Sequence, residues 1–317
     1  MKKCAVALAA LMGAAVAQAV PYSQLIVFGD SLSDSGNLLA RSQAYVPGVL
    51  PVGLPQAPYY QGRFSDGRAA VEWLADDLGV ALRNFSVGGA TTGLFNNQAP
   101  PLPGLLETGL RSQLAEFLSQ GPADGQALYT VFGGANDFLV ATPATANTIA
   151  AEAIGNLTQT VLDLYGAGAR NFLLPLLPDL GLTPRALASA DGGVGAQQMA
   201  LGFNAVLAAA YGQLAQMLPS AKLHVFDLAA THHKLLQQSA SIGISNTTSG
   251  CFSGFVGIPG ALCNDHSTHF YFDEIHPSAV VQREIGKAFL RTVPEPASYG
   301  LAALGLLAVA ARRRKSA

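Results

Sequence analysis

The sequence predicts an α/β domain with a parallel sheet that is covered by helices on both faces. Short apolar runs recur along the chain, and most of them end at a Gly, Pro or Asp, which is typical of buried strands. The segments between these runs have apolar residues three to four positions apart, which is the spacing of one helix face. Strands that alternate with helices form parallel sheets. Polar residues follow several of the runs, and sites in such sheets form at the carboxyl ends of the strands.

Five strands are predicted along the chain. The first covers Gln24–Phe28, and the others are Ala81–Phe85, Ala127–Phe132, Asn171–Leu176 and Lys222–Phe226. Helical spacing predicts helices over Val71–Leu78, around Ile154–Leu164, over Val194–Leu218 and over Ser278–Leu290. Two segments rich in Pro and Gly, Tyr45–Gln61 and Ala99–Gly104, are expected to be surface loops. Because no internal repeat or linker interrupts this pattern, residues 20–292 are expected to form one domain.

The central domain carries an acidic charge. The whole chain has a formal net charge of −2, but its basic residues cluster at the two ends. Between residues 20 and 292 there are 12 Lys and Arg against 19 Asp and Glu, a net charge of −7. An acidic domain lacks the basic footprint of a nucleic-acid-binding protein, so no nucleic-acid partner is expected.

The first 19 residues have the order of a secretory signal peptide. Met1-Lys2-Lys3 is positively charged, Cys4–Val16 is apolar, and Ala17-Gln18-Ala19 supplies small residues around a cut, so the mature chain would start near Val20. An uncleaved membrane anchor is the alternative, although the apolar run is short for a membrane span.

The last residues, 293–317, form a second targeting segment. Val293-Pro294-Glu295-Pro296 leads into an apolar run over Tyr299–Ala311, and the basic cluster Arg312–Lys315 follows. A short transmembrane run with a basic stop is retained at the inner membrane with the cluster on the cytoplasmic side. The tail resembles the PEP-CTERM sorting signal of Gram-negative bacteria. This resemblance implies an exosortase-type processing enzyme, transient contact with the inner membrane, and a final location at the cell surface or outside the cell. An ordinary tail anchor is the alternative.

Cys251 and Cys263 are the cysteines of the predicted mature chain. Export permits a disulfide between them, worth about 2–3 kcal/mol in the chain-entropy model, and free buried thiols are the alternative. Asp265, His266 and His269 lie nearby with a spacing that a metal site could use. No further ligand pattern accompanies them, so no metal is predicted.

A serine and a distant histidine are the candidate catalytic pair. Ser31 follows the first predicted strand, and a serine on a sharp strand-to-helix turn is well presented to a ligand. Ordinary turns and helix caps use the same residue types. Far along the chain, Asp273 and His276 precede the last predicted helix. A carboxylate three residues before a histidine can hold one imidazole nitrogen and leave the other to take a proton from a serine.

Two further segments follow predicted strands and could stabilise a developing negative charge. The glycine pair Gly88-Gly89 follows the second strand, where the backbone could approach a substrate closely. Asn136 follows the third strand, and its amide could donate a hydrogen bond to an oxyanion. Each segment alone could equally be a plain turn at the end of a strand.

Other polar residues are interpreted as structural. Asp30 braces the turn of the candidate serine, Asp34 caps the first helix, and Asp137 stabilises the turn that aims the neighbouring amide. His232 and His233 are interpreted as surface residues at the start of a helix.

The four segments, in this order, resemble the blocks of the GDSL/SGNH hydrolases. The resemblance covers Leu25 to about Leu290, and Gly62–Arg68 further resembles the branch with phospholipase-like and haemolysin-like members and esterase autotransporters. It implies a three-layer α/β/α sandwich with a five-stranded parallel sheet. It also places the nucleophile on Ser31, its catalytic partners on Asp273 and His276, and the oxyanion donors on Ser31, Gly89 and Asn136. Gly88 remains an alternative to Gly89, since the two are adjacent.

The predicted function is that of an exported serine hydrolase of carboxylic esters, without a cofactor. A lipid, a short acyl ester and an acetylated polysaccharide all remain possible substrates. One alternative is a metal-dependent phosphoesterase that would use Asp30, Asp34, Asp137 and His276. Another is a non-catalytic surface or matrix binding protein.

Overall fold

The computed structural model describes residues 22–45, 53–97, 105–142 and 144–293. They belong to one compact unit, Tyr22–Val293. The predicted signal peptide and most of the predicted sorting tail, including the apolar run Tyr299–Ala311, lie outside the described residues. Within the described part of the chain, no helix is long and apolar enough to cross a membrane. The transmembrane helix expected in the tail lies outside the residues that the structure describes.

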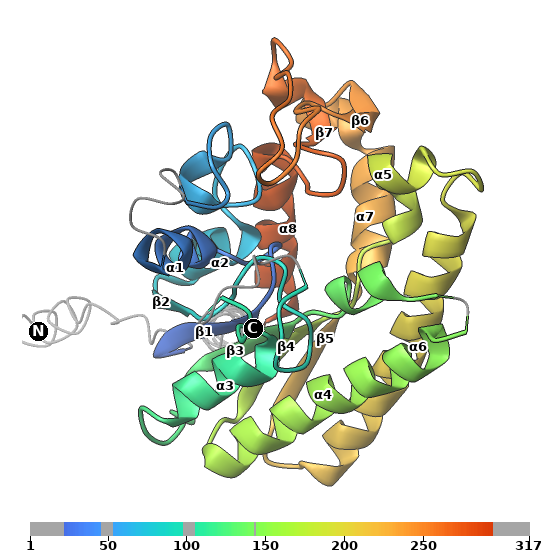
Figure 1. Cartoon of the computed structure of the whole chain (residues 1–317). Helices are drawn as coiled ribbons and strands as arrows, with labels where there is room; N and C mark the ends of the chain where they lie inside the picture. Colours follow the sequence, from blue (N-terminus) through green and yellow to red (C-terminus); the bar gives the residue numbers. More distant parts are fainter. Residues whose placement is uncertain (1–21, 46–52, 98–104, 143, 294–317) are drawn as a thin grey trace, which may run out of the picture. The chain divides into compact units, whose positions relative to one another are not determined.

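A five-stranded parallel sheet lies at the centre of this unit (Figure 1). Its order is β2-β1-β3-β4-β5, and every neighbouring pair of strands is parallel. The strands are β1 (Gln24–Gly29), β2 (Ala81–Asn84), β3 (Leu128–Phe132), β4 (Asn171–Pro175) and β5 (Lys222–Phe226). The predicted α/β fold is confirmed, and each strand lies within one residue of its predicted bounds.

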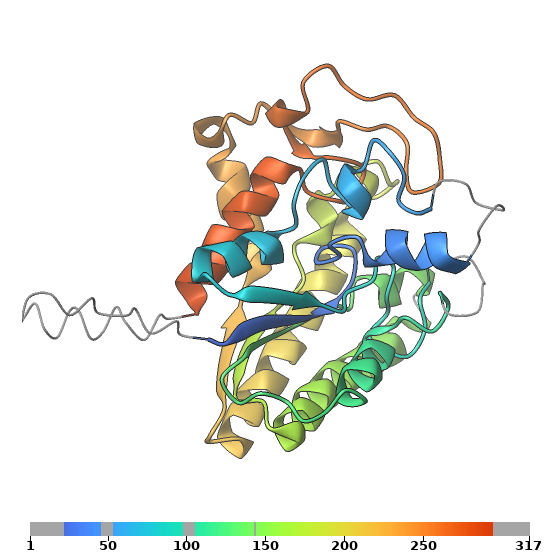
Figure 2. The same cartoon turned by 90° about the vertical axis from the view of Figure 1, so that its left-hand side faces the viewer.

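Two layers of helices cover the two faces of the sheet (Figure 2). On β1, Leu25 and Val27 belong to one core and Ile26 and Phe28 to the other, because successive side chains of a strand point to opposite faces. Residues of α2, α7 and α8 fill the first core, and residues of α3, α4 and α6 fill the second.

The helices are α1 (Asn37–Tyr45), α2 (Ala70–Leu78), α3 (Leu110–Leu118), α4 (Ala146–Ala167), α5 (Pro184–Leu187), α6 (Val194–Met217), α7 (Leu228–Gln237) and α8 (Ala279–Thr292). The 3-10 turns are η1 (Tyr60–Gly62), η2 (Asn136–Val140), η3 (Leu180–Leu182), η4 (Ser239–Ile242) and η5 (His266–Thr268).

The structure also contains elements that the sequence pattern does not indicate. β6 (Asn246–Gly250) pairs with β7 (His269–Tyr271) in a separate two-stranded sheet, and β6 is polar, so it lacks the apolar residues of the other strands. The interpretation of His232 as a surface residue at a helix start is wrong. α7 already begins at Leu228, after the cap residue Asp227, so His232 lies within the helix and is buried against the ring of Phe270.

Cys251 and Cys263 are joined by a disulfide in the structure, with their Cα atoms 4.9 Å apart. The Cys263 N–H also donates a hydrogen bond to the Cys251 carbonyl at 2.8 Å, so backbone and side chains close the same loop. His269 lies beside the two sulfur atoms. Because each sulfur is bonded to the other, this trio does not form a thiolate metal site.

We expect the mature exported protein to carry the Cys251–Cys263 bridge, because oxidising compartments preserve disulfides. Alkylation of the non-reduced protein, read by mass spectrometry, should leave both cysteines unlabelled, whereas a reduced sample should be labelled at both. Labelling of both cysteines without reduction would contradict the bridge. Reduction should lower the free energy of unfolding by about 2–3 kcal/mol.

The carboxyl ends of the strands gather remote parts of the sequence at one edge of the sheet. Ser31 follows β1, Gly89 follows β2 and Asn136 follows β3. His276 lies between β7 and α8, and it reaches the same edge from the far end of the chain. Parallel strands place their carboxyl ends together, which is why sites in such sheets form there.

Candidate active site

Ser31 lies on a tight turn at the end of β1. Gly29 leaves no room for a side chain, since a Cβ atom there would lie 2.7 Å from a backbone oxygen of β3. The Asp30 carbonyl accepts the N–H of Asp34 at 2.9 Å, and Asp30 Oδ1 accepts the N–H of Leu32 at 3.0 Å. Burial raises the pKa of Asp30 to about 6. Asp30 therefore braces the turn with both its backbone and its side chain.

The Asp34 carboxylate ties the serine turn to the loop after β2. Its Oδ1 accepts hydrogen bonds from the N–H groups of Gly36 and Asn37, at 2.8 and 2.6 Å. Its Oδ2 accepts from the N–H groups of Leu38 and Gly88, at 3.2 and 2.8 Å. Burial raises the pKa of Asp34 to about 6, although these four donors oppose the shift. The predicted cap of the first helix is confirmed, and the same carboxylate also positions the glycine pair.

His276 forms hydrogen bonds with both Ser31 and Asp273. Its Nε2 lies 2.9 Å from Ser31 Oγ, and its Nδ1 lies 2.7 Å from Asp273 Oδ2. Asp273 Oδ1 accepts the backbone N–H groups of Ile275 and His276, at 2.9 and 2.7 Å. The Asp273 side chain is fully buried, and His276 is 3% exposed. The three residues proposed from the sequence therefore converge in one hydrogen-bonded series.

Tyr59 completes the surroundings of Asp273, since its Oη donates a hydrogen bond to Oδ2 at 2.7 Å. Burial alone would raise the pKa of Asp273, but attraction to His276 and the surrounding donors hold this pKa below its ordinary value. Burial and the neighbouring carboxylate raise the pKa of Tyr59, so the phenol keeps its proton. Asp273 is therefore ionised at neutral pH and accepts hydrogen bonds on both oxygens.

Ser31, Gly89 and Asn136 line one cavity, and each offers a hydrogen-bond donor. No hydrogen bond to another described residue uses the N–H of Ser31 or of Gly89. The Gly88 N–H, in contrast, donates to Asp34. Gly89 has a φ of +82°, a backbone conformation that side-chain-bearing residues rarely adopt. Asn136 Nδ2 donates one hydrogen to the Ala90 carbonyl at 3.0 Å, which leaves the second hydrogen of the amide available to a ligand.

The residues around Asn136 hold it in place. Asp137 accepts hydrogen bonds from Thr92, from the N–H at 3.0 Å and from Oγ1 at 2.6 Å. Asn97 Nδ2 donates to the Asn136 carbonyl at 2.7 Å. These contacts join the loop after β2 to the turn after β3, so the Gly89 backbone and the Asn136 amide are positioned together.

Several residues near His276 carry no clear signal in the sequence. The rings of Phe64 and Phe255 lie 5.2 and 5.9 Å from the imidazole, measured between ring centroids. Tyr59 belongs to the segment expected to be a surface loop, yet it is buried, so that expectation is wrong at this residue. A buried tyrosine in a Pro-rich loop has no distinguishing periodicity, because its partners come from distant parts of the chain.

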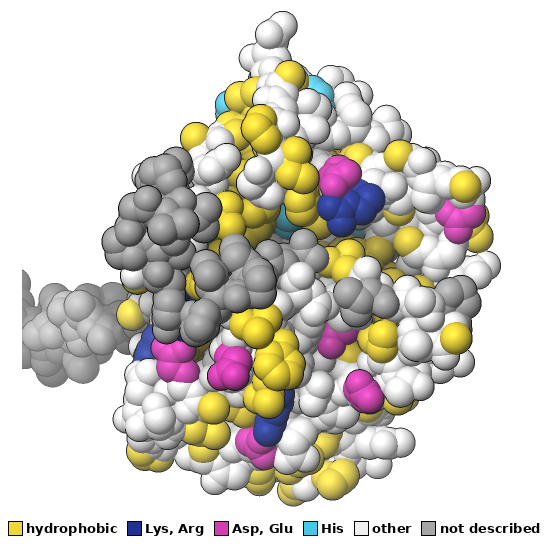
Figure 3. Space-filling view, viewed as in Figure 1, with side chains coloured by type: hydrophobic (Ala, Val, Ile, Leu, Met, Phe, Trp, Pro, Cys, Tyr) yellow, Lys and Arg dark blue, Asp and Glu magenta, His cyan; other side chains and the backbone are white. Residues whose placement is uncertain are grey.

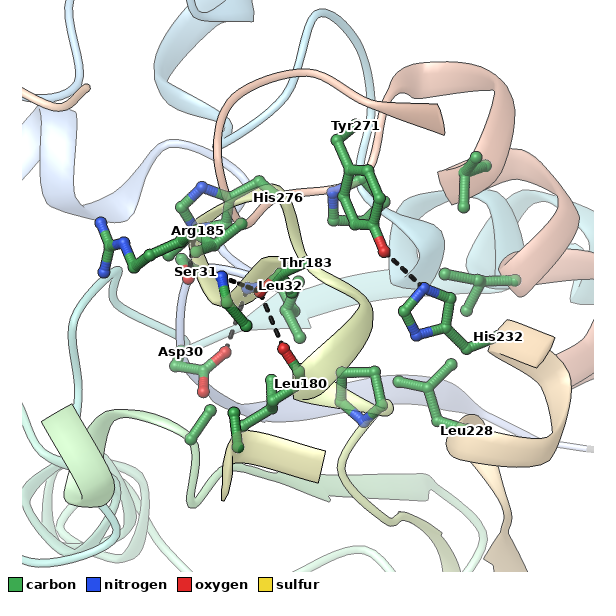
Figure 4. A pocket seen from close by; sticks show the side chains of 18 of the residues that line it. Asp30, Ser31, Leu32, Leu180, Thr183, Arg185, Leu228, His232, Tyr271 and His276 are labelled. Carbon is green, nitrogen blue, oxygen red and sulfur yellow. Dashed lines mark hydrogen bonds between the residues drawn. The ribbon is translucent and has the colours of Figure 1, made fainter. Parts of the chain in front are cut away.

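Two cavities lie next to the hydrogen-bonded residues Ser31, His276 and Asp273. The larger has a volume of about 450 Å³ and is lined by Ser31 and His276 together with residues of α7 and α8. The smaller has a volume of about 330 Å³ and is lined by Ser31, Gly89, Asn136 and the loop that contains Phe255. Figure 3 shows this face of the molecule, where hydrophobic side chains gather around a hollow. Figure 4 shows the larger cavity from close by.

A serine, a histidine and an aspartate joined in this way are the arrangement found in serine hydrolases, and here they lie at the carboxyl edge of a parallel sheet. The chain belongs to the GDSL-like lipase/acylhydrolase family, whose model matches residues 25–289. This family confirms the enzyme class predicted from the sequence, a carboxylic ester hydrolase. A second model, the PEP-CTERM protein-sorting motif, matches residues 292–315 and indicates an exported protein of a Gram-negative bacterium.

Curated relatives agree with this family. The chain is 28% identical over 265 residues to the phosphatidylcholine-sterol acyltransferase of Aeromonas hydrophila, covering 80% of this chain and 73% of that protein. It is 32% identical over 327 residues to the esterase EstA of Pseudomonas aeruginosa, covering 88% of this chain. The match spans 48% of that esterase, about half of its length. A solved structure of a lipolytic G-D-S-L protein from Veillonella parvula matches 84% of this chain and 96% of that one, with 14% identity and a TM-score of 0.46.

Proposed function

We propose that this protein is an exported serine hydrolase that cleaves carboxylic esters through an acyl-enzyme on Ser31. The observation that carries the proposal is the pair of hydrogen bonds made by His276, to Ser31 Oγ at 2.9 Å and to Asp273 Oδ2 at 2.7 Å. A serine hydroxyl is a weak nucleophile, and an adjacent base held by a third group is the arrangement that activates it.

The role of each residue follows from its hydrogen bonds. The ionised Asp273 can only accept hydrogen bonds, so His276 carries its proton on Nδ1 and presents a bare Nε2 to the Ser31 hydroxyl. Ser31 Oγ attacks the ester carbonyl carbon while its proton passes to Nε2. The imidazolium then protonates the alcohol as the bond between the carbonyl carbon and the alcohol oxygen breaks. Water, activated by the same nitrogen, releases the acid from Ser31.

The oxyanion formed by this attack would be held by the N–H groups of Ser31 and Gly89 and by the Asn136 amide. Gly88 is not a donor in this proposal, because its N–H is already used by Asp34. The support for the oxyanion role is that the remaining three donors lack a competing acceptor among the described residues, or keep one hydrogen available. Donors that are fixed before the reaction stabilise the transition state without reorganisation.

The Asn136→Ala variant should lower kcat by a factor on the order of 10² to 10³ and change KM much less, because an oxyanion donor acts mainly in the transition state. Steady-state kinetics on a soluble ester measure both constants. Asn156→Ala is the matched control, since the Asn156 amide contacts Thr92 in the same supporting network but lies outside the two cavities. A loss confined to KM would instead identify Asn136 as a ground-state binding residue.

The alternative of a metal-dependent phosphoesterase fits the contacts less well. It needs carboxylate oxygens that are free to bind a cation. Both oxygens of Asp34 already accept two N–H groups each, and Asp137 accepts two hydrogen bonds from Thr92. A non-catalytic binding protein would leave the hydrogen bond between Ser31 and His276 without a role.

The proposed setting of this activity is outside the inner membrane. The match to the sorting motif supports processing of the tail by an exosortase-type enzyme, after transient contact of the tail with the inner membrane. The proposed destination is the cell surface or the surrounding medium. The substrate in this proposal is an ester of a lipid, a short acid or an acetylated polysaccharide.

A further inference from the structure

The larger cavity beside Ser31 extends into the interior of the domain. Ser31 and His276 lie on one side of it, and Leu228 and His232 of α7 lie on the other (Figure 4). Its volume of about 450 Å³ falls within the range of small-molecule sites. A group attached to Ser31 Oγ could therefore continue into the space between the sheet and the α7 and α8 layer.

Apolar side chains of the core form much of the lining of this cavity. Leu228 comes from α7, Phe270 from β7, and Val281, Ile285 and Phe289 from α8. All five are buried, and they belong to the same core cluster. Buried apolar walls favour an apolar occupant, since such an occupant leaves water without losing hydrogen bonds.

His232 adds no charge to this cavity at neutral pH. His232 is 6% exposed, and burial lowers its pKa to about 4. The Tyr271 hydroxyl donates to the Leu182 carbonyl at 2.7 Å, so it can only accept from His232 Nε2, which lies 2.7 Å away. Of the charged residues of the lining, Arg185 and Asp191 are partly or fully exposed, which places them toward solvent, whereas Asp30 is buried next to Ser31.

The smaller cavity differs in its walls. It shares Ser31, Asn136 and His276 with the larger cavity, but it is also lined by Val256 and Ile258 of the disulfide-closed loop. Val256 is half-buried, and Ile258 is 60% exposed. Both cavities open to solvent, but the smaller one lacks the buried apolar side chains of α7 and α8 that line the larger one.

We propose that the larger cavity holds the acyl chain of the substrate, and that the substrate class is esters of medium-chain or long-chain fatty acids. This inference rests on the proposed function of Ser31. In that reaction the acyl group stays bonded to Ser31 while the alcohol leaves, so the larger cavity, with its buried apolar walls, suits the acyl chain, and the smaller cavity suits the alcohol. An acetyl group would leave the apolar cavity unfilled.

The test compares p-nitrophenyl acetate with p-nitrophenyl octanoate, which share one leaving group and differ in the acyl chain. The wild type should have a kcat/KM for octanoate about tenfold or more above that for acetate, because each methylene in an apolar pocket adds to binding. Leu228→Trp and Val281→Phe should fill the cavity from two different helices. Each should lower kcat/KM for octanoate about tenfold or more and leave the acetate value within about twofold.

Ile258→Trp is the matched control, since it enlarges a side chain of the smaller cavity and should leave the octanoate-to-acetate ratio unchanged. Acetate hydrolysis and the melting temperature report whether each filled variant is folded. The inference is overturned if the wild type does not prefer octanoate, whatever the variants do, or if a folded filled variant loses both esters equally. Absence of hydrolysis of any ester by the wild type would instead overturn the proposed function itself.

Discussion

Replacing Ser31 with alanine should lower ester hydrolysis by a factor on the order of 10⁴ or more, with the fold intact. The Ser31 hydroxyl makes its hydrogen bond to His276, and the substitution removes the nucleophile with that single contact. The turn itself is held by Asp30 and Asp34, which the substitution does not touch. Initial rates on p-nitrophenyl butyrate, with circular dichroism and thermal melting of the same samples, measure both parts of this prediction.

Ser33→Ala is the matched control for this experiment. Ser33 lies in the same turn, and its buried hydroxyl has no hydrogen-bond partner among the described residues, so the change should leave the rate nearly unaltered. A chelator should also leave the wild-type rate unaltered, whereas a metal-dependent phosphoesterase would lose activity. Turnover by Ser31→Ala that matches the wild type would eliminate the acyl-enzyme on this residue.

The central strands of the sheet, β1, β3 and β4, could be predicted from the sequence because they are buried on both faces. Val27 and Phe28 point to opposite cores, so β1 is a continuous apolar run with clear ends. β6 could not be predicted in this way, since Asn246–Gly250 is polar and pairs with a strand near the end of the domain. For α7, the sequence indicates only a helix start at His232 and His233. The helix begins earlier, after Asp227, because its start depends on this cap residue more than on apolar spacing.

Some residues of the candidate site could also be predicted from the sequence, and others could not. Ser31 and Asn136 follow predicted strands, so the parallel arrangement of these strands already brings them to one edge. The choice between Gly88 and Gly89 needed the structure, because it depends on which N–H is taken by Asp34. Tyr59 also needed the structure, since its contact with Asp273 joins residues more than 200 positions apart.

Replacing Asp273 with asparagine should lower kcat by a factor on the order of 10³ or more, because it selects the wrong tautomer of His276. The orientation of the new amide is fixed by its neighbours. The N–H groups of Ile275 and His276 both point at the Oδ1 position, so the amide oxygen must lie there. The amide nitrogen then takes the Oδ2 position and donates to His276 Nδ1. That nitrogen must lose its proton, so Nε2 carries the proton and cannot accept one from Ser31.

Tyr59→Phe separates this tautomer effect from a loss of packing around Asp273. It removes one donor to Oδ2 but keeps the carboxylate, and with it the proton on His276 Nδ1, so kcat should fall by only about tenfold or less. Steady-state kinetics on one soluble ester, run for the wild type and both variants, give the comparison. If the two variants lose activity equally, the contribution of Asp273 is structural. If Asp273→Asn keeps the wild-type rate, Asp273 does not set the protonation of His276, and the reaction must obtain its bare Nε2 in another way.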